Sequence, residues 1–453
     1  MSPGCRGRSE DRDRAHRRGN QDCQGALPRS GQRCRKARGG RGEAQHPQDA
    51  TLHPSAPAEG GGEKTPRHGR VDRVESRDAV CLIDRSDRPD CSYPLEEGKC
   101  MATNGIDQFL RTQAQSAASF SSTRAVLERE LYWSRTSTEI EVYKCSDARV
   151  KGSRYLKTPL GVLTPRRTIG GKFEMWWPDL QKEIEMWRQR AAKKFRHRCL
   201  SLFSYHFSRG DEHRGCAGFD CQTNDAIAYT TALLEDFKRI YQQSTMFGVM
   251  VGFETDLEAM VLHGESGEVL DLAEVEITSV SRLEWMIRRL FPSMDEESVR
   301  DFVPRVQANI EHIQEVRELE RPIEALGHQE HMLLVGRGYE YMHDPNALIV
   351  SPHTPDLAVP IASAGGVILN NINQGLVIPA KTPIVVVTSA PYFEPIGPEP
   401  ELARQKSLGL CRFAYRVLEE RVPELVRNYP VSTLAVTIDM TTWRLNIHDR
   451  VDR

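Results

Sequence analysis

The chain has 453 residues and a formal net charge of only −2, which argues against a nucleic-acid-binding protein. Its length suffices for two or three domains with a substantial core, and no apolar run of about 18 residues predicts a membrane-spanning helix. The 11 cysteines are an odd number without compact spacing, so we expect a reduced, cytosolic setting rather than a disulfide framework.

Residues 1–100 differ in composition from the rest of the chain. They are rich in Arg, Gly, Pro and Ser and contain a single aromatic residue, Tyr93. Such a segment cannot bury enough apolar surface to offset its conformational entropy, so we expect a disordered basic tail. Two interpretations stay open: a tether for acidic partners, and a spurious extension in front of a true start at Met101. Residues 101–138 then form a short helical N-terminal segment.

The pattern over residues 139–278 alternates strand and helix, which is typical of a parallel βαβ unit. Before this region, a helix is expected from Gln108 to about Tyr132. Within the region, the expected elements are a strand over Glu139–Lys144, a helix from Pro178 to about Lys194, a strand over Leu200–Phe207, a helix over Asn224–Gln243 capped by Asn224, and a strand over Met246–Phe253. We therefore expect a first α/β domain over residues 139–278.

Residues 279–453 repeat this order after a helical connection over Val280–Leu326. The expected elements are a buried strand over Pro383–Ser389, a helix over Leu402–Arg421 and a strand over Ser432–Met440. The repetition is a weak internal duplication, visible as a pattern rather than as identity. The second copy has no Cys or His where its first strand ends at Ser389, so only the first copy offers metal ligands at that place.

One group of residues in the first copy can carry chemistry. Cys145 ends a strand and begins the motif Cys-Ser-Asp-Ala-Arg, and about sixty residues later come His206, His213 and Cys216. Sites in open α/β sheets gather at the carboxyl ends of the strands. Two thiolates and one imidazole leave the fourth position of a tetrahedral Zn²⁺ open, which is the pattern of a catalytic zinc site. Asp147 and Arg149 are close enough to form an ion pair that keeps the carboxylate ionised.

These motifs resemble a known family. Cys-x-Asp-x-Arg followed by His and Cys resembles the signature of β-class carbonic anhydrases. The stretches Tyr205–Ser208, His213–Ala217, Met250–Asp256 and His328–His331, with Gly336–Tyr339, are similar to the carboxysome shell branch of that class. The resemblance covers about Glu139 to the C-terminus. It implies a β-carbonic-anhydrase-like zinc catalytic domain followed by a degenerate second copy.

The resemblance also implies a function. The expected enzyme is a carbonate dehydratase, a zinc lyase that hydrates CO2 reversibly to bicarbonate, with Asp147 and Arg149 as catalytic residues. The expected metal ligands are Cys145, His206 and Cys216, with His213 as the alternative histidine. We favour His206 because a residue at a strand end is held rigidly. Expected partners are Rubisco, shell proteins and further copies of the chain, in the carboxysome or otherwise in the plain cytoplasm.

Some features depart from the family, and other functions remain open. The helical N-terminal domain of the family is reduced here to about forty residues, and Ala217–Cys221 differs from the usual sequence after the last ligand. The alternatives are a carbon disulfide or carbonyl sulfide hydrolase on the same scaffold, and a non-catalytic, zinc-stabilised shell or scaffold protein. His328 resembles a family position near the active site, although a structural role is an equally good interpretation.

Overall fold

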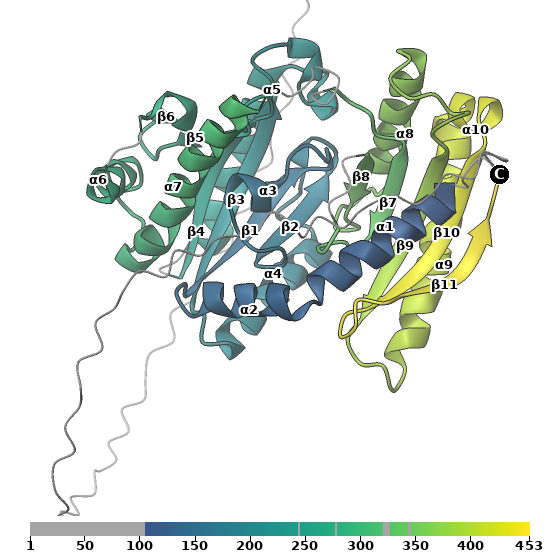
Figure 1. Ribbon diagram of the computed structural model, residues 1–453, viewed down its shortest axis with the longest axis horizontal. Coiled ribbons are helices and arrows are strands. Elements are labelled where there is room, and N and C mark those ends of the chain that lie inside the picture. Colours follow the sequence, from purple (N-terminus) through teal and green to yellow (C-terminus); the bar gives the residue numbers. More distant parts are fainter. Residues whose placement is uncertain (1–104, 243–244, 277–278, 320–326, 343–345) are drawn as a thin grey trace, which may run out of the picture. The chain divides into compact units, whose positions relative to one another are not determined.

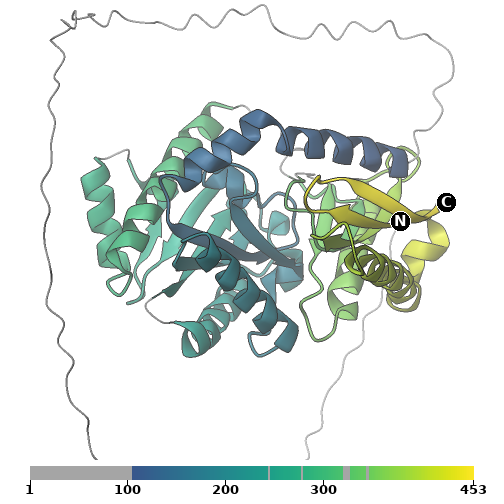
Figure 2. The same cartoon turned by 90° about the horizontal axis from the view of Figure 1, so that it is seen from below.

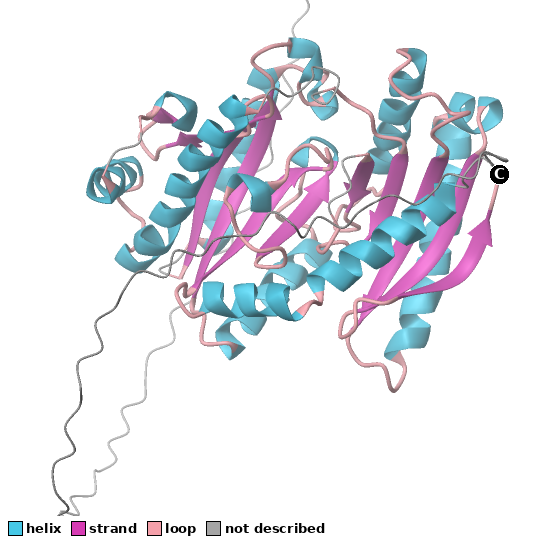
Figure 3. Ribbon diagram, in the orientation of Figure 1, coloured by secondary structure: helices cyan, strands magenta, loops and turns pink. Residues whose placement is uncertain are grey.

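The computed structural model describes residues 105–242, 245–276, 279–319, 327–342 and 346–453. The chain divides into two units, residues 1–93 and 94–453, and all described residues belong to the second unit. The expected basic tail lies outside the described residues. Within the second unit, two parallel-rich sheets carry helices on both faces, which confirms the α/β class (Figures 1 and 3).

The first sheet contains six strands in the order β2-β1-β3-β4-β5-β6. Its strands are β1 (Thr138–Cys145), β2 (Leu163–Thr168), β3 (Arg198–Phe207), β4 (Met246–Glu254), β5 (Ala259–His263) and β6 (Val269–Asp271). The first four are parallel, and β5 and β6 join antiparallel. Every residue of β1 and of β4 is buried, as expected for strands covered on both faces.

The second sheet contains five strands in the order β11-β10-β9-β7-β8. Its strands are β7 (Met332–Gly336), β8 (Ala347–Val350), β9 (Ile384–Tyr392), β10 (Val431–Asp439) and β11 (Leu445–Val451). Read from β8, this order repeats β2-β1-β3-β4-β5 strand for strand, with the last strand antiparallel in both sheets. The expected internal duplication is therefore present in the topology.

Helices cover both faces of each sheet because successive strand residues point to opposite sides. In β1, Val142 packs toward α6 (Val280–Leu290) and α7 (Glu296–Glu318), whereas Tyr143 packs toward α4 (Pro178–Lys193) and α5 (Thr223–Tyr241). The second sheet has α8 (Ala358–Asn373), α9 (Glu399–Arg421) and α10 (Pro423–Asn428) on one face. The other face is covered by α1 (Gly105–Phe120), which Figure 2 shows alongside that sheet.

The N-terminal segment forms two helices instead of one. Helix α1 ends at Phe120, and α2 (Thr123–Trp133) begins after Ser122, whose hydroxyl accepts a hydrogen bond from the Ala125 amide. A serine that caps a new helix interrupts the single predicted run. The expected cap at Asn224 is also wrong, because α5 begins at Thr223 and Gln222 precedes it.

The two sheets meet through their edge strands β2 and β8. The Ser351 amide donates to the Arg167 carbonyl at 2.8 Å, and the Arg167 amide donates to the Ser351 hydroxyl at 3.2 Å. The Ile349 amide reaches the Ser146 carbonyl, directly after β1, at 3.4 Å. The second copy is thus bonded to the backbone beside the first copy's site. Among helices in the described part of the chain, none is both long and apolar enough to cross a bilayer.

Candidate metal centre

Three predicted ligands come together at the carboxyl edge of the first sheet. Cys145, His206 and Cys216 each place one ligand atom within 4.8 Å of the others. The two sulfur atoms are 3.8 Å apart, and all three side chains are buried. The spacing allows all three side chains to share one ion.

The sheet explains why residues so distant in sequence meet. Cys145 is the last residue of β1, and His206 stands one residue before the end of β3. These strands are parallel neighbours in which Tyr143 pairs with Phe203, so their carboxyl ends lie at the same edge. Cys216 is brought to this edge by the loop that follows β3.

Two glycines, which the sequence analysis missed, allow this loop to close over Cys145. The Gly170 amide donates to the Cys145 sulfur at 3.3 Å. A Cβ atom on Gly218 would lie 2.6 Å from both the Cα and the N of Gly170, so the two backbones touch. Only glycine permits such an approach. Gly218 follows the expected ligand Cys216 by two residues and could have been noticed, whereas Gly170 lies 25 residues after Cys145 and carried no local signal.

The donor set fits a metal ion. Both ring nitrogens of His206 are buried without a hydrogen-bond partner among the described residues, which is costly unless something else binds them. The hydrogen bond from Cys216 holds the pKa of the Cys145 thiol well below its usual range, and the nearby His206 acts in the same direction. By contrast, the pKa of the Cys216 thiol is raised. The lowered pKa favours the thiolate form of Cys145. Two sulfurs and an imidazole form a site compatible with metal binding.

His213 does not reach this cluster. It lies on the exposed 3-10 turn Glu212–Arg214, where its carbonyl accepts a hydrogen bond from the Cys221 thiol at 3.4 Å. The geometry thus favours His206 over His213. Cys199 and Cys411 are buried away from the cluster, as expected of small apolar residues.

Asp147 and Arg149 form the expected ion pair beside the ligands. The Arg149 Nη2 and Nε atoms lie 2.6 Å and 3.2 Å from Asp147 Oδ2, and the Arg149 amide donates to Oδ1 at 2.8 Å. Burial alone would raise the pKa of Asp147, but the Arg149 charge outweighs it and holds the pKa well below the usual range. The carboxylate is therefore ionised.

The second copy contributes to this site through residues just before β7. His328 Nε2 lies 2.9 Å from Arg149 Nη2, and its Nδ1 lies 3.3 Å from a Glu330 oxygen. Glu330 is fully buried and accepts a hydrogen bond from Asn371 at 3.3 Å. His328 thus links Arg149 to the second sheet. Glu330 and Asn371 were not predicted, because their role depends on contacts between distant segments.

An α/β sheet with a Cys-His-Cys set and an Asp-Arg pair at its carboxyl edge is the arrangement that the resemblance to β-class carbonic anhydrases led us to expect. Residues 131–275 match the family model of the carboxysome shell carbonic anhydrase catalytic domain. The match contains the entire first sheet, and the second sheet lies outside it. The family resemblance expected from the sequence is confirmed for this region. A search of curated proteins found no match to the chain.

Proposed function

We propose that this chain is a zinc-dependent carbonic anhydrase that interconverts CO2 and bicarbonate. The observation that carries the proposal is the buried Cys145, His206 and Cys216 set, in which both ring nitrogens of the histidine lack a hydrogen-bond partner among the described residues. Support also comes from the adjacent Asp147–Arg149 pair and from the family match of the region that contains it.

Cys145, His206 and Cys216 would hold the zinc ion, and catalytic zinc sites with three protein ligands bind water as the fourth. A bound zinc ion would lower the pKa of water to about 7 and so supply hydroxide at neutral pH. Asp147 Oδ2 lies 3.7 Å from His206 Nε2, next to the ligands. Its carboxylate would accept a hydrogen bond from the attacking oxygen and so orient a lone pair of that oxygen toward the carbon of CO2. Arg149 keeps Asp147 ionised and holds its carboxylate in place by a two-point contact.

In this proposal the two copies have different tasks. Residues 139–278 form the catalytic domain, 279–453 form the helical connection and the copy without metal, and 101–138 form the N-terminal helical segment. The second copy positions Arg149 through His328, which is itself held by Glu330.

The family to which the catalytic region is matched supports a location in the carboxysome, where the enzyme would supply CO2 to Rubisco and assemble with shell proteins and further copies of itself. Co-purification of the chain with intact carboxysomes, and its loss when the shell is broken, tests this location. Recovery of the chain only in the soluble cytoplasmic fraction would contradict it.

Zinc quantification and stopped-flow CO2 hydration on the full chain test the chemistry. Cys145→Ala removes a ligand and should lose both zinc and activity. Asp147→Ala should retain zinc but lose roughly 10²–10⁴-fold in hydration rate. Cys199→Ala removes a buried cysteine of β3 outside the cluster and serves as the matched control, with zinc and activity retained.

Two results would reject the proposal. A zinc-loaded wild-type chain without hydration activity would point to a non-catalytic, zinc-stabilised scaffold. Zinc-dependent hydrolysis of carbon disulfide or carbonyl sulfide without CO2 hydration would point to the other chemistry on this scaffold.

A further inference from the structure

A pocket lies where the second copy would carry its own active site. Gly336 is the last residue of β7, as Cys145 is the last residue of β1, and the two strands hold the same place in their sheets. Residues 336–340 line one part of the pocket, and residues 164–167 of β2 line another. The segment after β7 thus corresponds to the segment after β1, beside the candidate metal centre. It borders a hollow whose other wall comes from the first sheet.

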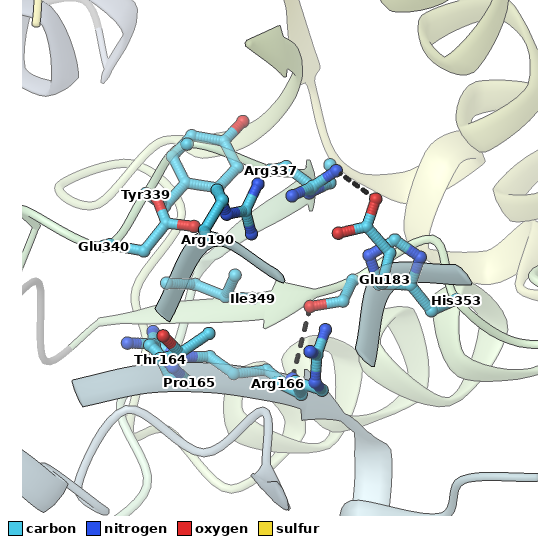
Figure 4. A pocket seen from close by; sticks show the side chains of 14 residues that line it. Thr164, Pro165, Arg166, Glu183, Arg190, Arg337, Tyr339, Glu340, Ile349 and His353 are labelled. Carbon is cyan, nitrogen blue, oxygen red and sulfur yellow. Dashed lines mark hydrogen bonds and ion pairs between the residues drawn. The ribbon is translucent and has the colours of Figure 1, made fainter. Parts of the chain in front are cut away.

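The lining of this pocket carries more positive than negative charge. Its charged residues are four arginines, Arg166, Arg167, Arg190 and Arg337, and two glutamates, Glu183 and Glu340. Figure 4 shows Arg190 and Arg337 around the same hollow as Glu183 and His353, with Thr164–Arg166 of β2 on another side. Four guanidinium groups against two carboxylates leave an excess of two positive charges. The excess falls to one when the buried Glu141, which pairs with Arg166, is included.

Internal ion pairs satisfy only part of this charge. Arg337 pairs with Glu183 at 2.6 Å, and Arg166 Nε pairs with Glu141 at 2.7 Å. Arg166 Nη2 is buried without a hydrogen-bond partner among the described residues. A buried donor left unsatisfied is costly, so a ligand that accepts its hydrogen bond would be stabilised.

Two further arginines of the lining lack a close acidic partner. Within the described ranges, neither Arg167 nor Arg190 has an acidic side chain within 4.0 Å. Burial lowers the pKa of Arg167 to about 10, with Glu340 as the nearby counter-charge. Because arginine remains protonated in proteins, these groups retain their charge and favour a bound anion.

We propose that this pocket is a binding site for a small oxyanion, such as phosphate or bicarbonate, at the junction of the two sheets. The pocket has a cavity volume of about 40 Å³, which limits its ligand to a small ion. Guanidinium groups match the oxygens of these anions through paired hydrogen bonds. His353, kept neutral by burial near Arg337 and Arg166, adds a polar group without further positive charge. The site does not depend on the proposed catalytic activity.

Isothermal titration calorimetry of the full chain with sodium phosphate, and separately with bicarbonate, tests the site. Titration with chloride at equal ionic strength is the control. Arg190→Gln should weaken binding about tenfold or more, because it removes a charge-assisted hydrogen-bond donor. Arg188→Gln is the matched control, because Arg188 lies on the same helix, is exposed and pairs with Glu185. It should change the dissociation constant by less than about twofold.

Cys145→Ala separates this pocket from the metal centre. If phosphate binds in the basic pocket, the variant without the metal ligand retains saturable binding, and Arg190→Lys recovers part of the affinity lost in Arg190→Gln. Saturation by phosphate alone or by bicarbonate alone supports the site and identifies the ion. The proposal is overturned if neither anion binds saturably, if Arg190→Gln binds as well as the wild type, or if Cys145→Ala abolishes binding.

Discussion

Replacing Gly218 with alanine tests whether the candidate metal centre depends on the close backbone contact between Gly218 and Gly170. The new Cβ atom would lie 2.6 Å from the Cα and N of Gly170, whereas ordinary contacts begin at 3.4 Å. One backbone segment must therefore move by roughly 0.8 Å, the difference between these distances, because no flexible side chain can give way. Gly170 donates to the Cys145 sulfur and Gly218 follows Cys216 by two residues, so the displacement separates the two sulfur ligands.

The expected effect is visible in both stability and metal affinity. Overpacking of this kind costs about 1–3 kcal/mol. Loss of a hydrogen bond to a metal ligand typically lowers metal affinity by roughly 10–100-fold. We therefore expect Gly218→Ala to lower the free energy of unfolding by about 2 kcal/mol and to weaken zinc binding by at least about tenfold.

Urea unfolding and zinc titration against a competing chelator measure these two effects. Gly409→Ala is the matched control, because Gly409 lies inside α9 and its Cβ would meet nothing within 4 Å. This control should gain about 0.4–1 kcal/mol of stability with unchanged zinc affinity. The reasoning is refuted if Gly218→Ala binds zinc and resists urea as well as the wild type.

Three other substitutions test the catalytic pair and the fold. Arg149→Lys loses the two-point contact with Asp147 and should slow hydration about 100-fold with zinc retained, and an unchanged stopped-flow rate would contradict this. Asp301→Ala removes a buried acceptor for the amide and hydroxyl of Thr138. It should lower the free energy of unfolding, measured in urea, by about 3 kcal/mol, and a loss under about 1 kcal/mol would disprove this. His353 has a folded pKa of about 2 against an ordinary 6.5, so below pH 6.5 only the unfolded chain gains its proton. Stability should therefore fall by about 2 kcal/mol between pH 7.5 and pH 5, and His353→Gln should lack this share in urea unfolding at both pH values.

The sequence predicted the structure best in two situations: where a residue stands at the end of a buried strand, and where a helix or strand buries one face. A buried strand followed directly by Cys145, and another that ends near His206, place both side chains at one sheet edge without any knowledge of the remaining contacts. The repeated strand-helix-strand order was likewise visible, because long apolar strands and amphipathic helices carry strong periodicity.

Features that depend on contacts between distant segments could not be predicted in this way. Strand β7 and strand β8 are short, and nothing local indicates that they take the places of β1 and β2. Helix α1 covers the second sheet although it precedes the first sheet in the chain, because Ile106 and Phe109 pack against strands more than two hundred residues away. The link from Arg149 through His328 to Glu330 also joins segments whose relation exists only in the folded chain.

One backbone position contributes to the asymmetry between the two copies. Gly336, the counterpart of Cys145, has a φ of +135°, and a Cβ atom there would collide with the Ser389 carbonyl oxygen on β9. The Ser389 hydroxyl also donates to the Arg337 carbonyl at 2.5 Å, which ties the loop after β7 to that strand. A cysteine ligand cannot be restored at Gly336 unless β7 and β9 move apart. The second sheet instead contacts Arg149 through His328, and its own strand-end hollow is lined by arginine.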